Sequence, residues 1–297
     1  MAFRLRPDES VTHGFRRLAR KELDAARDRL RAARPSRAEA IHESRKSVKK
    51  VRAILQLIED DDGSGLGRSE KRLRSVNRML SGLRDADVML ETLAKLRSRH
   101  PRLFSPHTFA SVRRRLAGEQ RVAARTAGRK DAWKTVDRRL GVVRRDARRW
   151  TPDHSGSGAL IRGILAVHQR GREAMKRARR QQRAEDFHAW RKAMKALWYA
   201  LRLVERSDAQ IRRDVRALHR AEILLGDDHN LVVLCEELAS DVTVCRGPVD
   251  VDRLRLLADH DQCRLRDKAI ARVGYVYNHR PDVYARAVAR AWKASRA

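Results

Sequence analysis

The segment Ile41–Glu59 reads IHESRKSVKKVRAILQLIE, and the segment Phe187–Glu205, 146 positions later, reads FHAWRKAMKALWYALRLVE. Each holds a His, an Arg and two Lys at positions i, i+3, i+4 and i+7, which share one face of an α-helix. These first and second basic ridges are His42, Arg45, Lys46 and Lys49, and His188, Arg191, Lys192 and Lys195. Like charges at this spacing are mildly destabilising, so a ridge that occurs twice indicates an anionic partner.

Apolar residues gather on the side of both segments opposite the ridge. They are Val48, Val51, Leu55 and Ile58 in the first segment and Met194, Leu197, Leu201 and Val204 in the second. Such a helix packs its apolar stripe on a core and leaves its polar face outward. A solvated face would explain one ridge, but the same order of residues in two ridges favours a binding surface.

Composition favours an all-α protein. The 297 residues include only 15 Gly, 7 Pro and 5% aromatic residues, so helix breakers and typical strand formers are both scarce. This length is enough for one large domain or two ordinary domains with real hydrophobic cores.

The charge balance indicates a polyanion as partner. The chain holds 69 Lys and Arg against 38 Asp and Glu, a net charge of +31, and 56 of the 69 cations are Arg. A compositional preference for Arg explains part of the ratio of Arg to Lys, but it does not explain 31 unbalanced charges. Nucleic acid, inorganic polyphosphate and an anionic membrane surface are the candidate partners.

Other sequence signals indicate a reducing compartment and no membrane span. The three cysteines form no CxxC pair, which is typical of thiols in a reducing compartment. No run approaches 18 apolar residues, and the N-terminus has no apolar signal region. We therefore expect a cytoplasmic protein; the sequence leaves the oligomeric state open.

Helical periodicity runs along almost the whole chain. Ser36 with Glu39 predicts a capped helix start, and Ser105 before Pro106 predicts another. The stretch 151–158, rich in Gly and Ser, is the predicted linker between an N-terminal helical bundle over 8–150 and a C-terminal one over 159–295.

The similarity between the halves extends beyond the ridges. The stretch LSGLRD at 80–85 aligns with LGDDHN at 225–230, at an offset of 145. We predict turns at both places, between helices over 68–81 and 85–99 and between helices over 209–225 and 231–240. The offsets indicate an internal duplication that gives two antiparallel helical bundles about a pseudo-two-fold axis.

Three interpretations of the ridge histidines are open. A phosphate would favour the charged imidazole and make each His an extra donor, most strongly at mildly acid pH. Metal ligation is disfavoured, because neither His42 nor His188 has a ligand at i+4 and the neighbours are cationic. A core or capping histidine is the third interpretation.

The sequence offers little for catalysis. No GxxxxGK[ST], HExxH, GxSxG or GxGxxG motif is present, and we expect no catalytic residue, metal ion or cofactor. The carboxylates Asp85, Asp87, Asp227 and Asp228 are predicted to cap helix N–H groups.

The ordered motifs HxxRKxxKxxR, HxxRKxxK, LxxLRDAD and LLGDDHN resemble the CHAD family, the conserved histidine α-helical domains. The resemblance covers residues from about 8 to 295 and implies that 1–297 is a single CHAD-like domain. It also implies two four-helix bundles and polyphosphate binding on a basic surface between the halves.

Carried over residue by residue, the resemblance implies that both ridges and Arg52 lie on that surface. Basic positions on the first helix of each half match less firmly; they are Arg16, Arg17, Arg20, Lys21, Arg170 and Arg172. Trp198 replaces an Arg of the family pattern and Asn230 replaces an Asp, so we expect the first half to bind more strongly. The family's partner domain, a triphosphate-tunnel fold, is absent, which argues against an attached hydrolase.

We therefore expect a non-catalytic protein that binds inorganic polyphosphate in a basic groove, with association with polyphosphate granules. The first alternative is nonspecific nucleic-acid binding by the same surface, although no aromatic residues are interleaved for base stacking. The second is a phosphohydrolase that acts through the histidines.

Overall fold

A computed structural model describes residues 3–32, 36–58, 66–102, 105–127, 130–151, 157–239 and 248–296. Within these ranges the chain forms eleven α-helices and one short 3-10 turn, with no β-strand. The expected all-α fold class is confirmed.

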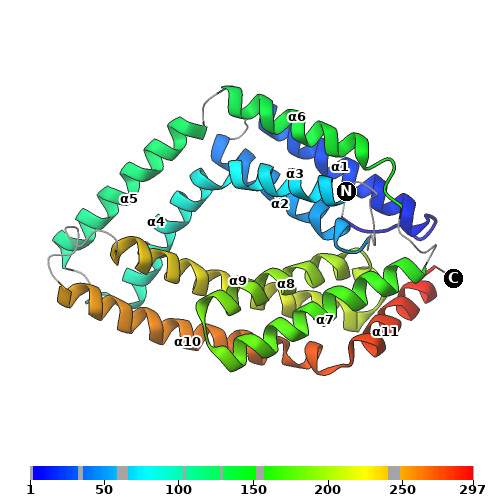
Figure 1. The fold of residues 1–297 in the computed structure, drawn as a ribbon. Helices are drawn as coiled ribbons and strands as arrows, with labels where there is room; N and C mark the ends of the chain where they lie inside the picture. Colours follow the sequence, from blue (N-terminus) through cyan, green and yellow to red (C-terminus); the bar gives the residue numbers. More distant parts are fainter. Residues whose placement is uncertain are drawn as a thin grey trace.

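The helices follow one another along the chain with short connections (Figure 1). Their bounds are α1 Val11–Ala32, α2 Arg37–Leu55, α3 Leu66–Met79, α4 Ser81–Arg99, α5 Pro106–Ala127, α6 Lys130–Asp146, α7 Ser157–Gln181, α8 Ala184–Arg202, α9 Ala209–Ala239, α10 Pro248–Asn278 and α11 Pro281–Ala294. Two predicted helix starts are confirmed. The Ser36 side chain accepts the N–H of Glu39 at 3.2 Å, and α5 begins at Pro106.

Two apolar cores hold the helices together. The larger core combines side chains of α1, α2, α3 and α6 with side chains of α7, α8, α9, α10 and α11. The smaller core lies where α4 and α5 meet the C-terminal half of α9 and the N-terminal part of α10, at the end of the molecule away from both termini (Figure 1). The helices α9 and α10 are 31 residues long and contribute to both cores.

The larger core includes residues from both sides of the predicted linker, among them Trp150 and Leu160. Residues 152–156 of that linker lie outside the described ranges, and 157–158 begin α7. The division into bundles over 8–150 and 159–295, and the duplication behind it, stay predictions.

Both predicted turns are corrected by the structure. The helix α9 continues through 225–230, and α4 begins at Ser81, so only Leu80 separates it from α3. Gly226 does not end a helix: a Cβ there would lie 3.0 Å from the Arg191 guanidinium, so the glycine admits that side chain close to α9.

The predicted capping roles of the four aspartates are wrong, because all four lie inside helices and not at their first residues. Asp227 pairs with Lys95 at 3.0 Å, and Asp228 accepts the Arg266 guanidinium at 2.8 Å. Asp87 accepts the Gln120 amide at 2.5 Å, and an Arg45 nitrogen lies 3.9 Å from Asp85. Inside a helix these carboxylates meet side chains of other helices instead of free N–H groups.

Candidate anion-binding site

The two basic ridges lie on α2 and α8, which pack against each other. Burial of the opposite stripes fixes the direction of the ridges, since Val48, Val51, Met194 and Leu197 are fully buried. The Ser44 hydroxyl also donates to the Ala26 carbonyl of α1 at 3.1 Å. The apolar stripes thus turn inward and the ridges meet at the seam between α2 and α8.

Five cations of the ridges form a central basic cluster. It consists of Arg45, Lys46 and Lys49 of α2 and Arg191 and Lys195 of α8. Burial, and then the charges of Lys195, Arg45 and Arg191, lower the pKa of Lys49 to about 7. Lys46 is exposed at the edge of the cluster, where its ammonium contacts Glu43 at 2.6 Å.

A buried carboxylate of α9 partly neutralises the second half of the cluster. One oxygen of Glu222 accepts the Arg191 guanidinium at 2.8 Å and the Lys195 ammonium at 2.6 Å. Although burial opposes the change, Lys195 and Arg191 hold the pKa of Glu222 below its ordinary value. Arg191 also donates to the Glu222 carbonyl at 3.3 Å, which fixes its position.

The ridge histidines differ in their surroundings. His188 packs against His229 of α9, with ring centroids 3.9 Å apart, and burial, then His229 and Lys192, lower the pKa of His188 to about 4. His188 is therefore neutral at physiological pH in the absence of a ligand. The imidazole of His42 lies 3.9 Å from the Glu43 carboxylate and is partly exposed.

Lys192 belongs to a neighbouring concavity. It lines a pocket of about 420 Å³ with Gln56, Arg170 and His188, among others. The Arg170 guanidinium donates to the Gln56 carbonyl at 3.4 Å and so links α7 to the end of α2. This pocket extends the basic surface from the second ridge toward α7.

Four further predicted site residues, outside the central basic cluster, are also held by protein partners. Arg52 forms a forked ion pair with Glu70 of α3, with a shortest distance of 2.7 Å. Arg172 donates to the Tyr277 carbonyl at 3.0 Å. On α1, Arg17 pairs with Glu9 at 2.5 Å, and Arg16 donates to the Trp150 carbonyl at 2.7 Å.

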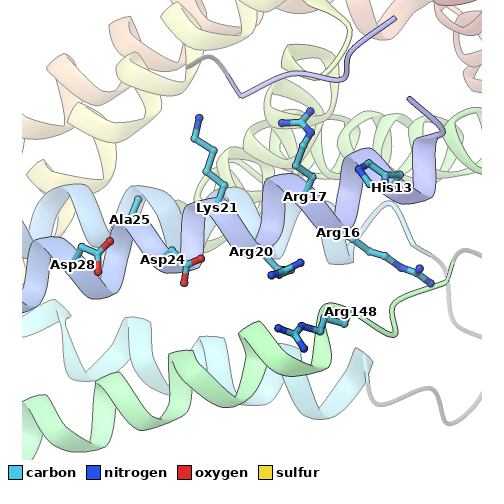
Figure 2. Close-up of a pocket in the computed structure, with 9 residues that line it drawn as sticks. All are labelled: His13, Arg16, Arg17, Arg20, Lys21, Asp24, Ala25, Asp28 and Arg148. Atoms are coloured by element: carbon cyan, nitrogen blue, oxygen red, sulfur yellow. The ribbon is translucent and has the colours of Figure 1, made fainter. Parts of the chain in front are cut away.

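Arg20 of α1 faces away from the cluster. Glu22 contacts Ser47 and Lys50 of α2, and Arg20 lies about 200° away from it around the helix. Arg16, Arg17, Arg20 and Lys21 line a separate pocket of about 710 Å³ (Figure 2).

Sequence reasoning did not find Glu222, His229 or Glu70. Each lies in a helix that carries no ridge, and its distance from the ridges along the chain gave no local signal. The stronger binding that we expect of the first half stays a prediction. The Trp198 ring stacks on His219 with ring centroids 4.6 Å apart, and its counterpart Arg52 is held by Glu70.

Neither a metal cluster nor a membrane span is found in the described ranges. No group of three or more His, Cys, Asp or Glu residues there could hold a metal ion. None of the helices described is long and apolar enough to cross a membrane.

Comparison with known proteins identifies the family to which this chain belongs. The family model of the CHAD domain matches residues 15–239, so this chain belongs to the CHAD domain family. The crystal structure of the CHAD domain from the plant Ricinus communis is similar, with a TM-score of 0.64 and 18% sequence identity. The similarity covers 92% of this chain and 95% of that one and supports the fold. Among curated proteins, none matches this chain.

Proposed function

We propose that the protein binds long-chain inorganic polyphosphate at the central basic cluster, without catalysis. The observation that supports this best is the position of Lys49. Its side chain is partly buried beside Lys195, Arg45 and Arg191, and it has no hydrogen bond or ion pair with any residue that the structure describes.

A cluster of this kind has a free-energy cost in the absence of a ligand. Burial penalises each charged group, and mutual repulsion adds to the penalty. A polyanion at the seam would relieve both, since its oxygens accept hydrogen bonds from the ammonium and guanidinium groups. Each charge-assisted contact contributes about 1.5–3 kcal/mol before entropy and desolvation costs, and released counterions add to affinity.

The surroundings of the cluster suit a chain of phosphates. Exposed Lys46 and Lys192 provide charge at its edges, and the pocket with Arg170 continues the positive surface. A duplication of the ridge segment would account for two similar ridges at one seam. We place the protein in the cytoplasm with polyphosphate granules as its site of action.

Nucleic acid is a weaker candidate ligand. Single strands are bound largely by stacking of bases on aromatic side chains. Of the aromatic residues that follow the second ridge, Tyr199 is buried and Trp198 stacks on His219. Binding of nucleic acid would therefore rest on charge alone.

A competition experiment tests the choice of ligand. The full chain, loaded with labelled long-chain polyphosphate at about 0.15 M salt, is titrated with duplex DNA of equal total charge. We expect DNA to displace polyphosphate only at large excess. Equal or stronger competition by DNA would contradict the proposal, and release of free phosphate over time would indicate a hydrolase.

Charge-matched variants test the location. Substitution of Lys46 and Lys192 by Ala removes two exposed charges beside the seam, and Arg113→Ala with Arg138→Ala removes two exposed charges far from it in sequence. We expect the first pair to weaken polyphosphate binding at least tenfold more than the second. Equal effects would place binding elsewhere. Adding Arg45→Ala and Arg191→Ala should weaken binding further, with circular dichroism as the check on folding.

A further inference from the structure

A second basic concavity lies between α1 and α6, apart from the central cluster. Its volume is about 710 Å³. Figure 2 shows the side chains of Arg20 and Arg148 in the space between the two chain segments, directed toward each other. The lining residues are His13, Arg16, Arg17, Arg20, Lys21, Asp24, Ala25, Asp28 and Arg148.

Three cations of this pocket lack protein partners. Arg20, Lys21 and Arg148 form no side-chain hydrogen bond or ion pair within the described part of the chain. The Nε atom of Arg20 is in addition shielded from solvent and has no acceptor. A buried donor without an acceptor is unfavourable, so a small shift of the Arg20 side chain toward an anion in the pocket would satisfy a group that the fold leaves unsatisfied.

The wall of the pocket is fixed before any ligand arrives. Arg16 donates to the Trp150 carbonyl at 2.7 Å and to the Thr151 hydroxyl at 3.0 Å, which ties α1 to the chain after α6. Arg17 is held by Glu9 and donates to the Arg4 carbonyl at 3.0 Å. Binding therefore requires little ordering of these two side chains, which favours affinity.

Acidic residues limit the size of the ligand. Asp24, which pairs with Arg144, and the exposed Asp28 line the same pocket, one and two helical turns beyond Arg20. From Arg20 to Asp28 the helix advances about 12 Å, so a long phosphate chain along α1 would reach the like charge of Asp28. A compact anion at the Arg16 end avoids both carboxylates.

We propose that the pocket between α1 and α6 is a separate binding site for a compact anion of two or three phosphoryl groups. The forked donors of Arg20 and Arg148 bind the phosphate oxygens, since Arg matches phosphate geometry with paired N–H groups, and Lys21, on the other side of α1, adds positive charge nearby. Inorganic pyrophosphate and the diphosphate of a nucleotide share this chemistry. The site is independent of the polyphosphate site at the central cluster.

Calorimetric titration of the full chain with inorganic pyrophosphate at about 0.15 M salt tests the proposal. The variant Arg20→Gln/Arg148→Gln should weaken binding about tenfold or more. The matched control is Arg149→Gln/Arg138→Gln, which removes two exposed arginines that do not line the pocket and should bind as the wild type does. Arg148→Gln alone, at an exposed position, guards against a folding defect.

Two further titrations distinguish inorganic pyrophosphate from a nucleotide, and the pocket between α1 and α6 from the central basic cluster. Titration with ADP shows whether the site accepts a nucleoside on the diphosphate. If Arg20→Gln/Arg148→Gln weakens pyrophosphate binding as predicted, binding of ADP indicates a nucleotide ligand, and failure of ADP to bind indicates inorganic pyrophosphate. Lys46→Ala/Lys192→Ala should retain pyrophosphate binding even where it loses long-chain polyphosphate. The proposal is overturned if the pocket variant and its control bind equally, or if sulfate competes as well as pyrophosphate. It also fails if the Lys46 and Lys192 substitutions alone remove pyrophosphate binding.

Discussion

Polyphosphate binding should take up a proton at Lys49. In the unliganded protein, burial and the neighbouring cations lower the pKa of Lys49 to about 7, so its amine is largely neutral at pH 8. A bound polyanion favours the ammonium and raises this pKa toward its ordinary value. Affinity must then fall as pH rises above 7, because the proton needed for tight binding becomes harder to acquire.

The size of the effect follows from linkage between protonation and binding. If the ligand restores the pKa of Lys49 to between about 9 and 10.5, affinity drops by about 25- to 50-fold from pH 7 to pH 9. The pKa of Lys195 is also lowered, by burial first, although Glu222 opposes that change. Lys195 therefore acts in the same direction as Lys49.

Titration calorimetry with long-chain polyphosphate at pH 7, 8 and 9 measures both the affinity and the number of protons taken up on binding. Affinity should fall as calculated, and the heat at pH 8 should depend on the ionisation enthalpy of the buffer, because close to one proton is taken up. Lys49→Arg keeps a permanent charge and should flatten the dependence on pH. Lys71→Met, at an exposed position of α3, is the control and should leave the dependence unchanged.

Two results would refute this reasoning. One is an affinity for polyphosphate that is the same at pH 7 and pH 9. The other is a slope with pH that is undiminished in Lys49→Arg, since Lys49 would then make no contribution to the titration.

The fold makes further predictions about stability. In Gly163→Ala, the new Cβ would lie 2.6 Å from the Leu57 carbonyl oxygen, so we expect a loss of about 1–3 kcal/mol in denaturant unfolding. Gly118→Ala, with no atom within 4 Å of the new Cβ, should instead gain up to about 1 kcal/mol, and equal effects would exclude the close contact. For Glu9, burial raises the pKa but Arg17 lowers it further, to a net value below the ordinary one. The ionised Glu9 carboxylate therefore stabilises the fold above the unfolded pKa near 4.5, and this stabilisation is lost as pH falls through the folded pKa. The difference in Tm between wild type and Glu9→Gln should shrink toward pH 3. A difference in Tm that stays constant with pH would contradict this role of Glu9.

The sequence predicts the helices because their signals are local. The period of 3.6 residues identifies the helices, and the capping serine Ser36 fixes the start of α2 from neighbouring residues alone. The same period could not show whether Gly226 ends a helix or admits Arg191, because that depends on a side chain 35 positions earlier in the chain.

The sequence by itself determined the helical class, the two ridges and the excess of positive charge, because each of these depends on residue type and spacing within a few turns. Only the tertiary structure decided which cations gather. It joined Lys49 with Lys195, assigned Glu222 to the second ridge, and engaged Arg52 with Glu70. It also turned Arg20 away from the seam. These outcomes depend on how α1, α2, α3, α8 and α9 pack, since charges separated by many residues interact only after the apolar stripes have brought their helices together.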